Sequence, residues 1–144
     1  MKCALFNPSK IGQDEALLAT RLILAYGFYT PAISKLTNID SVAQWFASLG
    51  IPLPVLNAYM AGGTELLGVI LLSLGLLTRF IALPLMVVMV VAITTVHLEH
   101  GFAAADNGFE IPLYYLIFLF VLATHGSGKW SVDRWLSSRS SCVV

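Results

Sequence analysis

The chain has 144 residues, of which 58% are hydrophobic and 11% charged, and its formal net charge is zero. With a mean hydropathy of +0.82, this composition is far from that of a soluble globular domain and predicts a protein embedded in a lipid bilayer. A neutral chain lacks the basic field that nucleic-acid binding requires, so no nucleic-acid partner is expected.

The cysteines and the N-terminus narrow the function further. Cys3 and Cys142 lie near opposite ends of the chain and form neither a C-x-x-C pair nor a metal-ligand spacing. A thiol–disulfide mechanism within the chain is therefore not expected. The apolar stretch before Asn7 and Pro8 is too short for the core of a signal peptide, so the first hydrophobic segment is expected to remain as a span.

Four segments are apolar enough to cross a bilayer or nearly so, which takes about 20 residues of helix for a core of roughly 30 Å. They lie at about residues 15–36, 55–77, 80–98 and 111–124. The connectors are mostly short. The sequence therefore predicts an all-α, up-down bundle of four transmembrane helices that forms one domain over residues 1–144.

The longer connector, residues 37–54, carries apolar residues at spacings of three and four, namely Ile39, Val42, Phe46 and Leu49. This spacing predicts a short amphipathic helix between the first two spans. It lies in the membrane interface in one interpretation and packs on the bundle in the other.

The distribution of lysine and arginine predicts the orientation, because cytoplasmic loops carry an excess of both. Near the span ends, one side has only Lys35, whereas the other has Lys2, Lys10, Arg79, Lys129, Arg134 and Arg139. We therefore expect a multi-pass protein of the bacterial plasma (inner) membrane with both termini in the cytoplasm.

Two charged residues fall inside the predicted spans. Arg21 lies about 9 Å into the first span, and Glu65 lies about 15 Å into the second from the opposite side, so their backbones differ in depth by about 6 Å. An unpaired charge near mid-bilayer costs at least ~2.5 to 3.5 kcal/mol, so a partner is expected. In one interpretation, Arg21 and Glu65 form a buried pair that fixes the register of the two helices. In a second, they line a polar cavity or a proton path. In a third, the two side chains never meet.

The connector between the last two spans, within residues 94–115, is rich in titratable side chains. His97 and His100 are spaced i, i+3 and would share a helix face. Asp106 or Asn107 suits the N-cap region of the last span, and Glu110 complements the positive end of its dipole. Solvated interface residues and caps are therefore one interpretation of this stretch.

A second interpretation is a site for a quinone-like headgroup. The side chains that would exchange protons with the headgroup or bind it are those of His97, His100, Glu110 and Asn107. Its aromatic wall would comprise Tyr29, Phe102, Phe109, Tyr114 and Tyr115. A third is a metal site from the two histidines and a carboxylate, for which H-x-x-H alone is a weak signal; no metal residues are assigned.

The order of several short motifs resembles the DoxX family of small four-helix membrane proteins, over nearly the whole chain. The motifs are R-L-I-L-A-Y-G-F-Y-T-P-A-I-S-K-L, G-I-P, E-L-L-G-V-I-L-L-S-L-G-L-L-T-R, H-x-x-H-G-F, N-G-F-E and G-x-G-K-W-S-V-D. The resemblance implies an inner-membrane protein, linked in some members to quinone-coupled sulfur oxidation or a membrane oxidoreductase complex. Other members resemble HvfX, found beside machinery for metal-binding peptides. Arg21, Glu65, His97 and Glu110 match recurring polar positions.

The sequence thus favours an integral membrane component of a redox system, with Arg21, Glu65 and His97 as candidates for proton transfer, a quinone as candidate cofactor, and an oxidoreductase subunit as partner. The alternative is a non-catalytic anchor or scaffold for a soluble oxidoreductase or for metal-handling, peptide-maturation machinery. The first predicts a polar cavity that joins Arg21 and Glu65 to the outer face, and the second a dry, closed bundle. A homo-oligomer is compatible with either.

Overall fold

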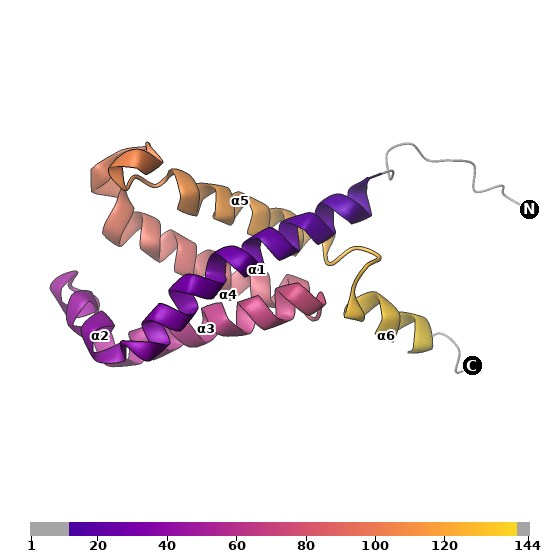
Figure 1. Cartoon of the computed structure of the whole chain (residues 1–144), viewed down its shortest axis with the longest axis horizontal. Helices are drawn as coiled ribbons and strands as arrows, with labels where there is room; N and C mark the ends of the chain where they lie inside the picture. Colours follow the sequence, from indigo (N-terminus) through magenta and orange to yellow (C-terminus); the bar gives the residue numbers. More distant parts are fainter. Residues whose placement is uncertain (1–11, 141–144) are drawn as a thin grey trace, which may run out of the picture.

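The structure is a computed structural model that describes residues 12–140. Cys3, Cys142, Lys2 and Lys10 lie outside the described residues. Within this range the chain folds into α-helices joined by short turns (Figure 1). They are α1 (Gln13–Thr37), α2 (Ile39–Ser48), α3 (Pro54–Leu74), α4 (Thr78–Ala92), α5 (Glu110–His125) and α6 (Val132–Ser140).

Apolar helices of membrane-spanning length account for most of the fold. Gln13–Thr37, Pro54–Leu74 and the continuous helical stretch Thr78–His100 are long and apolar enough to cross a bilayer, and Glu110–His125 is apolar but shorter. The third span continues beyond α4 through a π-helical turn, Ile93–His97, and a 3-10 turn, Leu98–His100. The predicted all-α, multi-pass membrane fold is confirmed.

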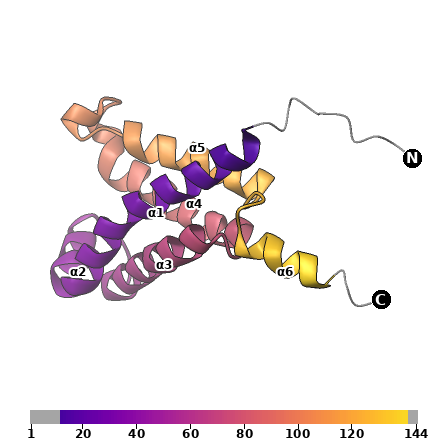
Figure 2. The ribbon, with the colours of Figure 1, turned by 45° about the vertical axis from the view of Figure 1, so that its right-hand side comes forward.

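The helices pack as two pairs. α1 lies chiefly against α3, and α4 chiefly against α5. The pairs cross closely where Gly68 of α3 meets Leu85 of α4, since a Cβ on residue 68 would come within 2.8 Å of the leucine methyl carbon. From there the pairs diverge toward the end that carries α2, as both views show (Figures 1 and 2).

The hydrophobic core fills the end where the pairs converge. Its fully buried members include Leu24, Leu72, Leu85, Leu119 and Leu122, which come from α1, α3, α4 and α5. Between helices in a bilayer there is no hydrophobic driving force, so close van der Waals packing of these side chains holds the convergent ends together. The diverging ends lack this packing, which leaves space between the pairs.

The predicted connector helix is α2. It packs on α3 through a small cluster of Ala43, Phe46 and Ala58, whereas Trp45 is 45% exposed. α2 therefore covers the divergent end of the bundle and leaves an aromatic ring at its surface.

Arg21 joins several elements at the convergent end. Its guanidinium donates to the carbonyl oxygen of Leu72 at 3.2 Å and to that of Trp130. Gly75 is required beside it, because its φ is +67° and a Cβ would overlap the guanidinium. This fully buried arginine therefore connects α1, the end of α3 and the segment before α6.

Asp133 caps α4 from a distant part of the chain. Its carboxylate accepts hydrogen bonds from the backbone N–H of Leu77 at 2.9 Å and of Thr78 at 3.4 Å, while its own N–H donates to the carbonyl of Gly75. A carboxylate here satisfies free N–H groups and complements the helix dipole. α6 is thereby fixed to the turn between α3 and α4.

Asp133→Ala should lower the free energy of unfolding in detergent by about 1 kcal/mol, because the first turn of α4 loses its cap. Thermal unfolding monitored by circular dichroism would measure the loss. Asp106→Ala is the matched control, because Asp106 is exposed and no side-chain hydrogen bond to it occurs among the described residues. Equal destabilisation by both substitutions would contradict a capping role.

Candidate functional site

An ion pair joins α1 to α3 in the half of the bundle where the two helix pairs diverge. The Nζ of Lys35 donates to both carboxylate oxygens of Glu65, at 2.7 and 2.8 Å. Glu65 is 1% exposed, and the Lys35 side chain 20%. A buried carboxylate among apolar helices requires such a partner, because its charge is otherwise costly in lipid.

Small residues allow the helices to approach at this point. Gly62 lies one turn before Glu65 on the same face of α3. A Cβ on residue 62 would stand 3.0 Å from the Leu36 side chain and 3.3 Å from the Lys35 Cβ. The last turn of α1 therefore rests on the backbone of α3, which sets the lysine beside the carboxylate.

The predicted pairing of Arg21 with Glu65 is wrong. The prediction aligned the ends of the two spans, but Gly62 lies beside Lys35, and Gly75 beside Arg21. In this register α3 starts about two turns beyond the end of α1. Arg21 therefore lies near the end of α3, where backbone carbonyls replace the expected carboxylate.

A cavity of about 860 Å³ opens between the two helix pairs beside the ion pair. Its walls are mostly apolar and come from α1, α2, α3, α5 and the stretch from α4 to His97. The polar side chains among its lining residues are Lys35, Asn57, Thr64, Glu65, Thr95, His97 and Tyr115. A mostly apolar pocket with a few converging polar groups is the usual form of a small-molecule site.

His97 belongs to this cavity because the π-helical turn changes the helix period just before it. Its Nδ1 lies 2.7 Å from the carbonyl oxygen of Asn107. A carbonyl only accepts, so Nδ1 carries the hydrogen in this contact. Among the described residues, no hydrogen bond engages Nε2, which leaves this nitrogen open to a ligand.

Tyr115 of α5 forms part of the cavity wall. Its ring packs edge-to-face on Phe28, with the centroids 5.4 Å apart. Gly27 makes room for it, because a Cβ there would overlap the Tyr115 hydroxyl. The hydroxyl thus lies against the α1 backbone on a surface of the cavity.

The remaining predicted site residues lie outside the cavity lining. His100 directs Nδ1 to the carbonyl of Val96 at 2.9 Å. Glu110 accepts from Tyr114 Oη and from the N–H of Ala104, both at 3.0 Å. Tyr29 is 53% exposed on α1. Of the predicted outer-face residues, His97 therefore lines the cavity, whereas five others do not: His100, Glu110, Asn107, Tyr114 and Tyr29.

The prediction that the two histidines share a site is not met, because it assumed a regular helix. The regular helix gives way to a π-helical turn and then a 3-10 turn here, and the two rings bind different groups: His97 binds the carbonyl oxygen of Asn107, whereas His100 binds that of Val96 in its own helix. Asn107 does not cap α5, whose N-cap residue is Phe109 without a side-chain cap; instead its carbonyl holds His97. Within residues 12–140, no group of three or more metal-ligating side chains could hold a metal ion.

Lys35 is the site residue that the sequence interpretation missed. It appeared there as a topological signal near the end of a span. The available clue was the G-x-x-E spacing of Gly62 and Glu65, which places a small residue and a carboxylate on one face of the neighbouring span. That face favours a close helix, and a lysine on that helix can reach the carboxylate.

Lys35→Met should destabilise the protein by about 3 kcal/mol, because it leaves the buried Glu65 carboxylate unpaired. The double variant Lys35→Met/Glu65→Gln should recover part of the loss, since neither side chain then carries a charge. Thermal unfolding in detergent would give both values. Lys129→Met, which breaks the exposed pair with Asp14 at 2.9 Å, should cost at most about 1 kcal/mol; equal costs at both lysines would contradict this account.

Comparison with known proteins places this architecture in a family. The family model described as DoxX matches residues 16–98. An uncharacterized protein of Haemophilus influenzae is 36% identical over 131 residues, covering 85% of this chain and 84% of the relative. An uncharacterized membrane protein of Mycobacterium tuberculosis is 31% identical over 137 residues, covering 88% and 84%.

A third relative, from Bacillus subtilis, bears the name "Putative oxidoreductase CatD" and is 33% identical over 119 residues, covering 83% of this chain and 85% of its own. No solved structure matches the chain. The matched segment contains α1, α3, the ion pair and His97, and the resemblance noted in the motifs is confirmed: this chain is a multi-pass membrane protein that belongs to the DoxX family.

Proposed function

We propose that this chain is the membrane component of a redox system and that its intramembrane cavity receives the headgroup of a quinone. The observation that carries the proposal is the meeting of the Lys35–Glu65 ion pair and His97 in one mostly apolar cavity of about 860 Å³. The polar groups suit a ring with two oxygens, and the apolar walls suit its lipid-soluble tail.

Lys35 and His97 provide complementary chemistry for such a ring. The Lys35 ammonium has three N–H groups and directs two interactions to Glu65, so one N–H is left for a quinone oxygen. His97 can accept a proton from a quinol hydroxyl through Nε2, or donate one to a quinone when it is charged. Glu65 can exchange protons with Lys35 and any water beside it.

An oxidoreductase partner supplies the electrons in this proposal. Reduction of a quinone takes up two electrons and two protons, and the proton carriers are the residues of the cavity. The name of the Bacillus subtilis relative includes an oxidoreductase function, which supports the assignment to redox chemistry. We place the protein in the bacterial inner membrane with both termini in the cytoplasm, in accordance with the distribution of Arg79, Lys129 and Arg134.

The cavity supports one of the two functions that the sequence left open. The Lys35–Glu65 pair could fix helix register in a scaffold as well, but a scaffold gives no reason for a cavity lined by that pair and His97. The lined cavity therefore favours a ligand-binding component over a scaffold. Arg21 has no part in this site, because it does not line the cavity.

Trp45 offers a direct test of binding, because it lines the cavity and quinones quench tryptophan fluorescence. Titration of the detergent-solubilised protein with a short-chain ubiquinone should give saturable quenching, and Trp45→Phe should remove most of it. His97→Gln should weaken the apparent affinity about tenfold, since it removes a hydrogen bond to a group that becomes charged during reaction.

His100→Gln is the matched control, because His100 lies three residues away but outside the cavity lining. Its affinity should equal that of the parent protein. Quenching that does not saturate, persists in Trp45→Phe, or falls equally in the two histidine variants would contradict the proposed site.

A further inference from the structure

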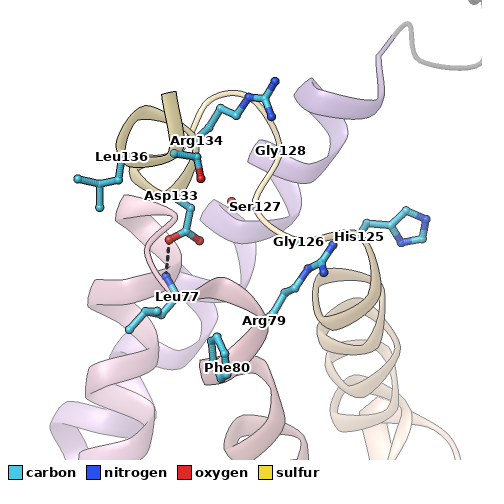
Figure 3. A pocket seen from close by; sticks show the side chains of 11 residues that line it. Leu77, Arg79, Phe80, His125, Gly126, Ser127, Gly128, Asp133, Arg134 and Leu136 are labelled. Atoms are coloured by element: carbon cyan, nitrogen blue, oxygen red, sulfur yellow. Dashed lines mark hydrogen bonds between the residues drawn. The ribbon is translucent and has the colours of Figure 1, made fainter. Parts of the chain in front are cut away.

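A second pocket, of about 740 Å³, lies at the convergent end of the bundle. Figure 3 shows the turn from α3 to α4 on one side, the end of α5 on another, and α6 above. α1 and α4 begin at this end, and α3 and α5 finish there. The pocket therefore lies at the level where the spans leave the bilayer.

Basic side chains line this pocket from three elements. Arg79 extends from the first turn of α4 toward the segment that follows α5, Arg134 comes from α6, and His125 ends α5 (Figure 3). Among the described residues, neither arginine forms an ion pair with a carboxylate, and the stretches outside that range contain no Asp or Glu. The charge of Arg134 also acts on Asp14, which lies outside the pocket. Arg79, Arg134 and Asp133 together leave the pocket with a net positive charge that can attract an anion.

The carboxylate in the pocket is already engaged. Both oxygens of Asp133 accept backbone N–H groups of the α4 start, at 2.9 and 3.4 Å, and the dashed line in Figure 3 marks the first. Its charge is partly offset by the positive helix end. Among the described residues, no ion pair joins Asp133 to Arg79 or Arg134.

Arg79 is positioned by its neighbours. Gly126 adopts φ +82°, and a Cβ there would stand 3.0 Å from Arg79 Nε. One edge of the guanidinium group thus lies against the glycine backbone, which limits the conformations that the side chain must lose on binding. A guanidinium held in this way can offer two parallel N–H groups to a phosphate.

Apolar side chains adjoin the basic groups. Leu77, Phe80 and Leu136 line the same pocket and are 49%, 72% and 45% exposed. Trp130 and Trp135 are exposed nearby in the chain, at 64% and 53%, as is common for residues at a membrane interface. A phosphate pocket beside lipid-facing apolar residues fits a phospholipid better than a soluble anion.

We infer that this pocket binds the phosphate of an anionic phospholipid, with Arg79 and Arg134 as its ligands and the acyl chains beside Leu77 and Phe80. The site does not depend on the quinone proposal, because it lies at the other end of the bundle and shares no lining residue with the central cavity. It would anchor α6 to the membrane surface.

Native mass spectrometry of the whole, detergent-solubilised protein can measure binding of phosphatidylglycerol, of phosphatidylcholine and of inorganic phosphate. Phosphatidylglycerol should bind more tightly than phosphatidylcholine. Arg79→Gln and Arg134→Gln should each weaken it about tenfold, because each removes a charge-assisted hydrogen bond. The exposed Arg134 keeps the test valid if Arg79→Gln folds poorly.

Lys129→Gln is the matched control, since it removes one positive charge at the same end but outside the pocket, where Asp14 already pairs with it. It should change phosphatidylglycerol binding at most about twofold. Equal weakening in all three variants, or equal binding of both lipids, would overturn the inference. Displacement of the lipid by inorganic phosphate at similar concentration would overturn the lipid assignment in favour of a soluble phosphate.

Discussion

The pairing of Lys35 with Glu65 sets the geometry on which the rest of the bundle depends. Neither charge can remain alone among apolar helices, so α1 and α3 must take the register that brings the two together. Gly62 permits that register, because no side chain keeps the helices apart. The same register places Arg21 beside Gly75 at the far end. The Lys35–Glu65 pair thus also determines which groups lie within reach of the buried Arg21 guanidinium.

Arg21 and Asp133 together close the end opposite the cavity. Arg21 binds carbonyl oxygens of α3 and of the segment before α6, and Asp133 binds the N–H groups at the start of α4. Backbone groups left free at helix ends are therefore satisfied by side chains from elsewhere in the chain. This explains the order G-x-G-K-W-S-V-D after the last span as a structural clamp. With one end clamped, the other can diverge around a cavity.

Composition and hydropathy were sufficient to predict the helices, because each span must satisfy its backbone internally and the lipid requires a long apolar run. The connector helix was also predictable from its apolar spacing. The partner of Glu65 was harder to predict. The G-x-x-E spacing marks the face of α3 that a helix approaches, but the choice between Arg21 and Lys35 on that helix depends on a register offset of about two turns. The separation of His97 from His100 was hidden for a similar reason: a π-helical turn has no reliable sequence signal.

That irregular turn links the outer connector to the interior. His97, the last residue of the π-helical turn, lines the cavity, whereas the ring of His100 binds the carbonyl oxygen of Val96 in its own helix. The carbonyl of Asn107, itself at φ +62°, then fixes the ring and its tautomer. π-helical turns recur at functional sites because they are costly and seldom retained otherwise. The strained residues of the connector are thus explained by the one histidine that they orient toward the buried ion pair's cavity.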